Sequence, residues 1–342
     1  MSGDNIGNAT KTALFIGGTG TISSSITKLA GRDHAWRLYV LNRGTRPGRL
    51  PDGVRQITAD INDLDNVKKA LSGLAFDVVA DFIAYDVKDV ARDVELFSGR
   101  IKQYIFISSA SAYQKPVLSL PISESTPLRN PYWEYSRKKI ACEDLLAREY
   151  RENEFPGTIV RPSHTYNYDN FPVAVHGGRK NNWQTLLRMR EGRPVIIPGD
   201  GTSLWTLTHA DDFAHGFIGL MGNPATLGHA FHITSDDVLA WNRIYALIAD
   251  ALDVKLNAVH VASEKIARYN QDFAGTLLGD KAHSVYFDNS KLRSFVPRFN
   301  PVIRFSDAIR AIIGTMIATP GAQIPDPDFD AWCDMVIAAE KR

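Results

Sequence analysis

The stretch "ALFIGGTGTISSSI" (residues 13–26) joins a short apolar run to a helical pattern through a glycine-rich turn. Gly17, Gly18 and Gly20 stand where the run ends, and a turn without side chains lets backbone N–H groups approach a ligand closely. The first turn of the following helix favours the negative charge of a phosphate. Ser23 occupies the third small position of this spacing, where a glycine is usual. We therefore predict a pyrophosphate-binding turn whose contacts are Gly17, Thr19, Gly20, Thr21 and Ile22.

Short apolar runs recur after this turn, and helical patterns separate them. Such nearly continuous runs are typical of strands buried on both faces of a parallel sheet. The later predicted strands are "RLYVLN" (37–42), "VRQITAD" (54–60), "FDVVADF" (76–82), "QYIFISS" (103–109) and "GTIVRP" (157–162). The helical patterns cover residues 21–32, 63–73, 86–99 and 133–152. This alternation predicts an α/β, Rossmann-type doubly wound sheet, and a glycine-rich turn that opens such a sheet indicates a dinucleotide site.

The regular alternation ends near residue 165. The segment "SHTYNYDNFPVAVHGGRKNN" (163–182) is rich in Asn, Gly, Pro and aromatic residues, and loops of this length are usually functional. We expect a dinucleotide-binding domain over residues 11–165, to which residues 205–235 return. A smaller, mostly helical C-terminal substrate domain then consists of residues 166–204 and 236–342.

The composition excludes several classes of protein. The 342 residues include 39 basic and 38 acidic side chains, so no overall field attracts nucleic acid or an anionic membrane. The two cysteines, Cys142 and Cys333, lie far apart, as in proteins of a reducing compartment. No apolar run is long enough for a signal peptide or a membrane span. We therefore expect a cytoplasmic protein. His229 and His232 fall on opposite faces of a predicted strand, so we expect no metal site.

The segment "LNRGTRPGR" (41–49) follows the second predicted strand and bears on the choice of cofactor. An acidic residue there usually binds the ribose of NAD, whereas a basic residue accommodates the 2′-phosphate of NADP. The chain offers Asn42 and Arg43, which favours NADP, although a solvated loop would show the same residues. Asp60 follows the third strand and can approach the adenine or act only as a helix N-cap. The remaining expected cofactor contacts are Ile61, Ala84, Tyr135, Lys139 and Pro162.

The segment "YWEYSRKK" (132–139) contains a pair of residues suited to proton transfer. Tyr135 and Lys139 are four residues apart and so share one face of a helix. A phenol titrates near pH 10, and ionising it near neutrality needs a favourable field worth roughly 4 kcal/mol. The ammonium group of Lys139, together with an oxidised nicotinamide, supplies a field of that sign. A serine at the end of the strand in "IFISSASAY" (105–113) can bind the substrate oxygen.

Taken together, these motifs resemble the extended short-chain dehydrogenase/reductase family, also called the NAD-dependent epimerase/dehydratase family. The resemblance rests on residues 17–22, Asp60, "FISSASAY" (106–113), Tyr135 with Lys139, "VRP" (160–162) and the segments "PGDG" and "THADDFA" within 198–214. It implies that Ser109 is the catalytic hydroxyl, with Ser108 or Ser111 as alternatives. It implies that Tyr135 is the acid/base and that Lys139 lowers its pKa and holds the nicotinamide ribose. It also implies a homodimer.

Two residues after the expected catalytic serine depart from part of this family. Members that dehydrate sugar nucleotides usually carry an acid just after the catalytic Ser or Thr, because proton removal beside a ketone needs a second base. Here Ser109 is followed by Ala110 and Ser111. We therefore disfavour dehydration and expect reversible hydride transfer at a carbinol, in an epimerase or in a net reductase or dehydrogenase.

The substrate side departs further from the sugar-nucleotide enzymes. His164 and Trp205 stand where the family commonly has an Asn and a phosphate-binding Arg, and a neutral indole cannot pair with a diphosphate. Either Arg179 and Lys180 bind the anion instead, or the substrate is not a sugar nucleotide. The aromatic residues of this region can stack on a substrate or simply pack, and His164 can carry protons or be structural. The predicted substrate contacts are Ser111, His164, Tyr166, Arg179, Trp183 and Trp205.

Two other classes of function stay open. The turn "LNRG" (41–44) and the segment "ISSASAY" (107–113) look similar to the chloroplast stem-loop-binding relatives of this family, in which the fold binds RNA. Tyr135, Lys139 and the near-neutral charge argue against RNA as the partner and favour a small-molecule substrate. A redox sensor that binds the cofactor without turnover would bind it equally well after Tyr135→Phe.

Overall fold

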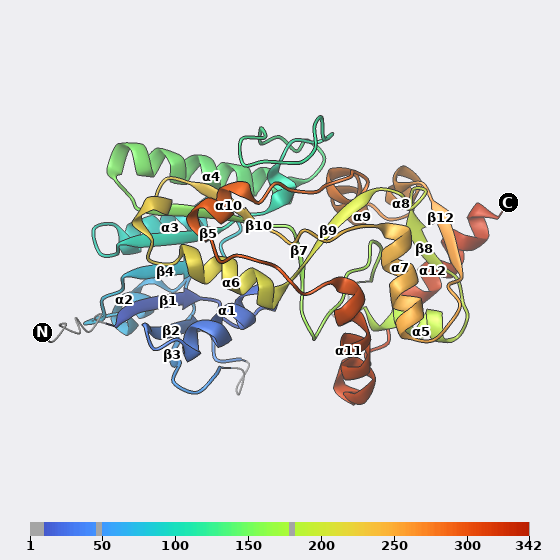
Figure 1. Ribbon diagram of the computed structural model, residues 1–342, viewed down its shortest axis with the longest axis horizontal. Helices are drawn as coiled ribbons and strands as arrows, with labels where there is room; N and C mark the ends of the chain where they lie inside the picture. The colour runs from blue at the N-terminus through green and yellow to red at the C-terminus, as the bar shows by residue number, and fades with distance from the viewer. Residues whose placement is uncertain (1–9, 46–49, 178–181, 342) are drawn as a thin grey trace, which may run out of the picture.

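The structure is a computed structural model that describes residues 10–45, 50–177 and 182–341. Figure 1 shows a layered α/β region that holds the first half of the chain and a second region built mainly from later helices. Segments from both halves of the chain contribute to the α/β region, because α6 and β10 return to it.

The centre of the α/β region is a seven-stranded parallel sheet with the order β10-β6-β5-β4-β1-β2-β3. The strand order reverses between β1 and β4, and in such sheets ligands bind at the carboxyl ends of the strands near that reversal. The strands are β1 (Lys11–Ile16), β2 (Trp36–Asn42), β3 (Arg55–Thr58), β4 (Val78–Asp81), β5 (Gln103–Ile107), β6 (Gly157–Pro162) and β10 (Ala230–Ile233). The predicted doubly wound fold is confirmed.

Helices cover both faces of this sheet, which explains the continuous apolar runs. In β1, Ala13 and Phe15 pack on one face, and Leu14 and Ile16 pack on the other. The first face is covered by α1 (Thr21–Arg32), α6 (Ala210–Leu220) and α10 (Ser290–Phe295). The second is covered by α2 (Leu64–Ala70), α3 (Val87–Phe97) and α4 (Glu134–Asn153). Strands buried on both sides cannot show polar and apolar alternation.

The second region, here the C-terminal lobe, has its own apolar core around Trp241, Tyr245 and Ile312. Its sheets are the three-stranded β11-β9-β7 and the two-stranded β12-β8. The strands are β7 (His164–Tyr166), β8 (Val195–Pro198), β9 (Leu204–His209), β11 (Val238–Ala240) and β12 (Ala258–Val261). The helices are α5 (Trp183–Arg190), α7 (Trp241–Ala251), α8 (Ser263–Tyr269), α9 (Asp272–Thr276), α11 (Phe305–Ala318) and α12 (Pro327–Glu340). A π-helical turn (Leu277–Lys281) follows α9.

None of the helices in the described ranges is both long and apolar enough to cross a membrane. Cys142 and Cys333 are both buried free thiols. Within residues 10–45, 50–177 and 182–341, no three His, Cys, Asp or Glu side chains are grouped so that they could hold a metal ion.

Candidate active site

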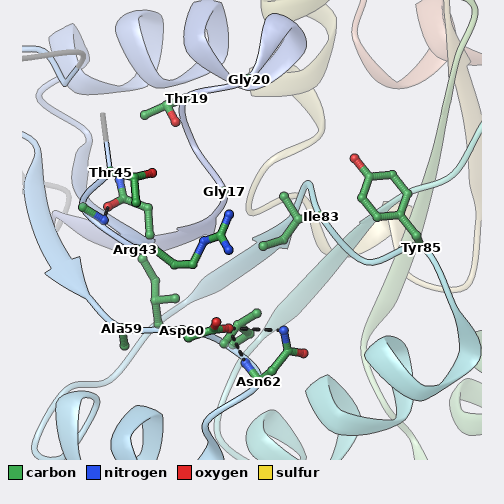
Figure 2. A pocket seen from close by; sticks show the side chains of 14 residues that line it. Gly17, Thr19, Gly20, Arg43, Thr45, Ala59, Asp60, Asn62, Ile83 and Tyr85 are labelled. Carbon is green, nitrogen blue, oxygen red and sulfur yellow. Dashed lines mark hydrogen bonds between the residues drawn. The ribbon is translucent and has the colours of Figure 1, made fainter. Parts of the chain in front are cut away.

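A pocket of about 430 Å³, here the cofactor cradle, opens at the carboxyl ends of β1, β2 and β4 (Figure 2). Gly17 has a φ of +84°, and a Cβ there would lie 2.5 Å from Ile83 Cγ2, so no side chain fits at this position. Among the predicted cofactor contacts, the cradle brings together Gly17, Thr19, Gly20, Asn42, Arg43, Asp60 and Ile61. A glycine cradle at a helix N-terminus fits a dinucleotide. Thr21 lines the adjoining hollow together with Thr19 and Gly20, and Ile22 follows it in the first turn of α1.

Ser23 explains how the turn tolerates a serine in place of the third glycine. Its hydroxyl donates to Gly17 O at 2.8 Å and accepts from Gly20 N at 2.8 Å, which closes the loop. Thr27 Oγ1 donates to Gly18 O at 2.8 Å and fixes the loop from the next turn. The first N–H groups of a helix have no acceptor within the helix. Those at the start of α1 are therefore available to bind an anion in the cradle.

Three polar side chains line the nucleoside end of the cradle. Asn42 Oδ1 accepts from Gly44 N at 2.9 Å, and Asp60 Oδ1 accepts from Asn62 N at 3.0 Å. The N-cap of α2 is Asp63, so Asp60 does not serve as that cap. Arg43 extends toward the Gly17 turn in Figure 2 and makes no hydrogen bond or ion pair within the part of the chain that is described. It is therefore a cation of the cradle without a partner among the described residues.

A second cavity of about 230 Å³, here the reaction cavity, lies between the sheet and the C-terminal lobe. It brings together the predicted residues Ser109, Ser111, Tyr135, Pro162, His164 and Trp205. The other lining residues are Ala110, Trp133, Ser163, Asp280, Val285 and Phe287.

The hydroxyl groups in the reaction cavity form a chain. Ser109 Oγ lies 2.8 Å from Ser111 Oγ, and Ser136 Oγ donates to Ser111 Oγ at 2.8 Å. The Ser109 hydroxyl and the phenol of Tyr135 line the same cavity, and the serine acts to lower the pKa of the phenol. Ser108 instead donates to Glu143 in the interior, so it does not compete for this position. The geometry therefore places Ser109 beside Tyr135, with Ser111 behind it.

Burial has the largest effect on the pKa of Tyr135. Burial raises the pKa of Tyr135 to about 12, and the Ser109 hydroxyl opposes this only in part. The ammonium of Lys139 lies 5.8 Å from the centre of the Tyr135 ring and does not offset the burial. The expected lowering of the pKa by Lys139 together with an oxidised nicotinamide stays a prediction; in the protein alone, burial disfavours the phenolate. The phenol is therefore protonated at neutral pH.

Lys139 is held by the backbone beneath the reaction cavity. Its Nζ donates to Ala84 O and Ile107 O, both at 2.7 Å, and the residue is only 2% exposed. Burial lowers the pKa of Lys139 to about 8. Asp81 Oδ1 accepts from Ile83 N and Ala84 N and so orients the loop that binds the lysine. Ala84 thus enters the site through its carbonyl.

The far wall of the reaction cavity carries uncharged groups. The rings of His164 and Trp205 lie 6.3 Å apart, and Trp205 Nε1 has no hydrogen-bond partner among the described residues. Burial, assisted by Lys281 and His176, lowers the pKa of His164 to about 3. His164 is therefore neutral at physiological pH and cannot store a proton there.

Two predicted substrate contacts are not brought to this cavity, and a third lies outside the described residues. Tyr166 is 1% exposed and packs edge-on against His209 and Phe305, and Trp183 is buried in the same lobe core. For these two aromatic residues the structure shows packing. Arg179, with Lys180, lies outside the described residues.

Asp280 is a site residue that the sequence patterns do not indicate. It reaches the reaction cavity from the π-helical turn, and burial raises its pKa to about 6, opposed by Lys115 and Lys281. Asn130 Nδ2 connects this turn to Ser111, because it donates to Gly279 O at 2.7 Å and to Ser111 O at 2.8 Å. Only the fold brings this segment to β5, so no local spacing could reveal it. π-Helical turns are frequent at functional sites.

Comparison with known proteins identifies the family. The model of the NAD dependent epimerase/dehydratase family matches residues 13–234, and the chain belongs to this family. The chain is 26% identical over 261 residues to 2′-dehydrokanamycin reductase of Streptomyces kanamyceticus, covering 76% of this chain and 72% of that protein. It is 26% identical over 254 residues to chloroplast stem-loop binding protein of 41 kDa b of Arabidopsis thaliana. This match covers 70% of this chain and 63% of that protein.

Among solved structures, UDP-glucuronic acid 4-epimerase of Bacillus cereus in complex with UDP-glucuronic acid and NAD superimposes with a TM-score of 0.70. The two sequences are 17% identical, and the match covers 90% of this chain and 99% of that one. This likeness supports the fold. The family and the resemblance to a stem-loop-binding relative, both predicted from the motifs, are confirmed.

Proposed function

We propose that the protein is an NAD(P)-dependent oxidoreductase that transfers hydride reversibly at a carbinol carbon of a sugar or sugar-like substrate. Tyr135 is the acid/base, Ser109 holds the substrate oxygen, and Lys139 holds the nicotinamide ribose. One observation carries this proposal. Tyr135 and Ser109 line one cavity, where the Ser109 hydroxyl acts on the pKa of the phenol, and the buried ammonium of Lys139 lies 5.8 Å from the centre of the Tyr135 ring.

The protonation state of Tyr135 favours the direction of reduction. A bound reduced nicotinamide supplies hydride to the carbonyl carbon. The Ser109 hydroxyl donates a hydrogen bond to the carbonyl oxygen, and the Tyr135 phenol gives that oxygen its proton. Because burial raises the pKa of Tyr135 to about 12, the proton is in place at neutral pH. Lys139 uses two of its three N–H bonds on backbone carbonyls and keeps the third for a ribose hydroxyl.

Within this activity we favour net reduction of a substrate without a diphosphate over epimerisation of a sugar nucleotide. The described lining of the reaction cavity contains no Lys or Arg and includes one carboxyl group, Asp280. A diphosphate would need cationic partners there. The similarity to a protein named as a reductase of a kanamycin derivative supports the same choice.

We also propose that NADP is preferred over NAD, because Arg43 is the free cation of the cradle. Residues 11–165 and 205–235 would bind the cofactor, and residues 166–204 and 236–342 the substrate. The cytoplasm and a homodimer remain our predictions. RNA binding, which the stem-loop-binding relative raises, is the less favoured alternative, and a salt-dependent RNA interaction without cofactor turnover would support it.

The proposal is tested by incubating the purified protein with NADPH or NADH and a panel of keto-sugars and keto-glycosides, and following the near-ultraviolet absorbance of the reduced cofactor. We expect oxidation of NADPH that depends on the carbonyl compound and is lost in Tyr135→Phe. Tyr150→Phe, on the same helix outside the cavity, is the matched control. Turnover that persists in Tyr135→Phe would overturn the proposed role of Tyr135.

A further inference from the structure

A second hollow of about 650 Å³ adjoins the reaction cavity, and the two share Trp133 and Tyr135 as walls. We call it the aromatic groove. It is defined by Tyr85, Tyr132, Trp133 and Tyr135 on one side and by residues 271–275 around α9 on the other. Trp133 and Tyr135 therefore contribute to the surface of both hollows.

The aromatic residues of the groove are exposed where packing would bury them. Tyr85 is 52% exposed and Tyr132 is 47% exposed, although both lie in a hollow. Aromatic faces left open beside a catalytic residue are typical of ligand sites, since they supply contact area with little side-chain entropy to lose. The open faces therefore indicate a ligand.

The groove is held in a fixed shape. The rings of Trp133 and Tyr135 lie 4.9 Å apart, and those of Tyr85 and Tyr135 lie 6.4 Å apart. A Cβ at Gly275 would lie 2.2 Å from Trp133 Cδ1, so the indole lies flush against α9. A preformed wall of this kind reduces the ordering cost of binding.

The groove carries charges of both signs, and Arg137 has no ion pair within the described ranges. Lys138 is paired with Asp86 and Glu134, each at 3.3 Å, and Arg137 Nη1 donates to Pro131 O at 2.9 Å. The carboxylate of Asp272 has no ion pair or side-chain hydrogen bond within the described ranges. The groove thus offers aromatic faces and a free hydrogen-bond acceptor. This combination matches a sugar ring, whose C–H face stacks and whose hydroxyl or ammonium groups donate.

We infer that the aromatic groove is a subsite for a second ring of the substrate. The inference rests on the proposed function and deepens it: the ring that accepts hydride lies in the reaction cavity, and the ring linked to it stacks on Tyr132 and Trp133. The substrate class is then a glycoside of at least two rings without a diphosphate.

Binding calorimetry on the full-length protein loaded with oxidised cofactor tests this subsite. The probes are glucosamine with one ring, neamine with two, and UDP-glucose as a diphosphate. We expect neamine to bind more tightly than the other two. In Tyr132→Ala, neamine should bind about ten-fold more weakly, while glucosamine is unaffected.

Matched variants separate stacking from other effects. Tyr132→Phe keeps the ring and should retain neamine affinity, and Tyr150→Ala removes an exposed tyrosine elsewhere on α4 and should change nothing. No binding of neamine to the unmodified protein, tighter binding of UDP-glucose, or neamine affinity indifferent to Tyr132→Ala would each overturn the subsite. Tyr135-dependent turnover alongside such a result would leave the proposed function standing. If neamine binding depends on the Tyr132 ring but no turnover is found, the subsite stands and the proposed function does not.

Discussion

The cofactor cradle and the reaction cavity are lined by different residues and are built in different ways. The cradle is made largely of backbone, with Gly17 and Gly20 removing side chains from the surface that a ligand meets. The reaction cavity is made of side chains contributed by the segment after β5, by α4, β6, β7 and β9, and by the π-helical turn. A backbone site demands glycine at fixed spacing, whereas a side-chain site can change its ligand through single residues such as Trp205 and Asp280.

The largest expected effect is on the reaction cavity side. Tyr135→Phe removes the proton donor and should lower kcat by about three orders of magnitude. Because the cradle is separate, the affinity for NADPH should stay unchanged. Stopped-flow turnover and fluorescence titration of the cofactor measure the two quantities. Unchanged turnover, or a loss of cofactor affinity that matches the loss of turnover, would break the distinction between the two sites.

The second expected effect is a pH dependence of kcat/KM for NADPH that arises from Lys139. Burial lowers the pKa of Lys139 from its usual value to about 8, so the ammonium is fully present below that pH and is lost as the pH rises through it. The value of kcat/KM for NADPH, which reports the free enzyme, should be level below about pH 8 and fall above it. Tyr135 stays protonated over this range.

Lys139→Arg is the control for this pH dependence, because a guanidinium keeps its charge over the whole range. The decline above pH 8 should disappear in this variant even if its activity is lower at every pH. A decline that persists with arginine in this position would assign it to another group.

The third effect is on cofactor choice. Arg43→Ala should weaken NADPH binding about ten-fold and leave NADH binding unchanged, since only the 2′-phosphate loses a charged partner. The ratio of the two dissociation constants measures this effect. Arg268→Ala removes a cation outside the cradle and should not change the ratio. Equal losses of affinity for NADPH and NADH would show that Arg43 does not bind the 2′-phosphate.

The smallest effect is on stability of the cradle. Ser23→Ala removes both hydrogen bonds that close the glycine turn and should lower the free energy of unfolding by about 1–2 kcal/mol. Ser24→Ala, in an exposed position, is the matched control. Urea denaturation measures both variants. A cost in Ser24→Ala equal to that in Ser23→Ala would mean that closure of the turn does not stabilise the fold.

The difference between the sites also explains what could be predicted from the sequence. The sheet and the glycine turn are local patterns, and so is the helical spacing of Tyr135 and Lys139, so all of these were found. Asp280 was not, because only the tertiary fold brings the π-helical turn to Ser109. Tyr166 was predicted as a substrate contact because an aromatic residue in a long loop looks the same whether it stacks on a ligand or packs.

The burial of Tyr135 could not be predicted from the sequence, for a physical reason. Spacing along a helix indicates which charge is one turn away, but not how deeply the phenol is buried. In the folded protein, burial outweighs the lysine and raises the pKa to about 12. This makes the tyrosine a proton donor in the absence of an oxidised cofactor and leads to the expectation of net reduction.

The most direct test of this account follows the hydride itself. The protein is incubated with a two-ring keto-glycoside and reduced cofactor deuterated at the transferring position, and the products are analysed by mass spectrometry and NMR. The account predicts a deuterium on the new carbinol carbon and an equal amount of oxidised cofactor. Inversion of a sugar alcohol with no net change in the cofactor would contradict it, as would oxidation of the cofactor without deuterium in the sugar.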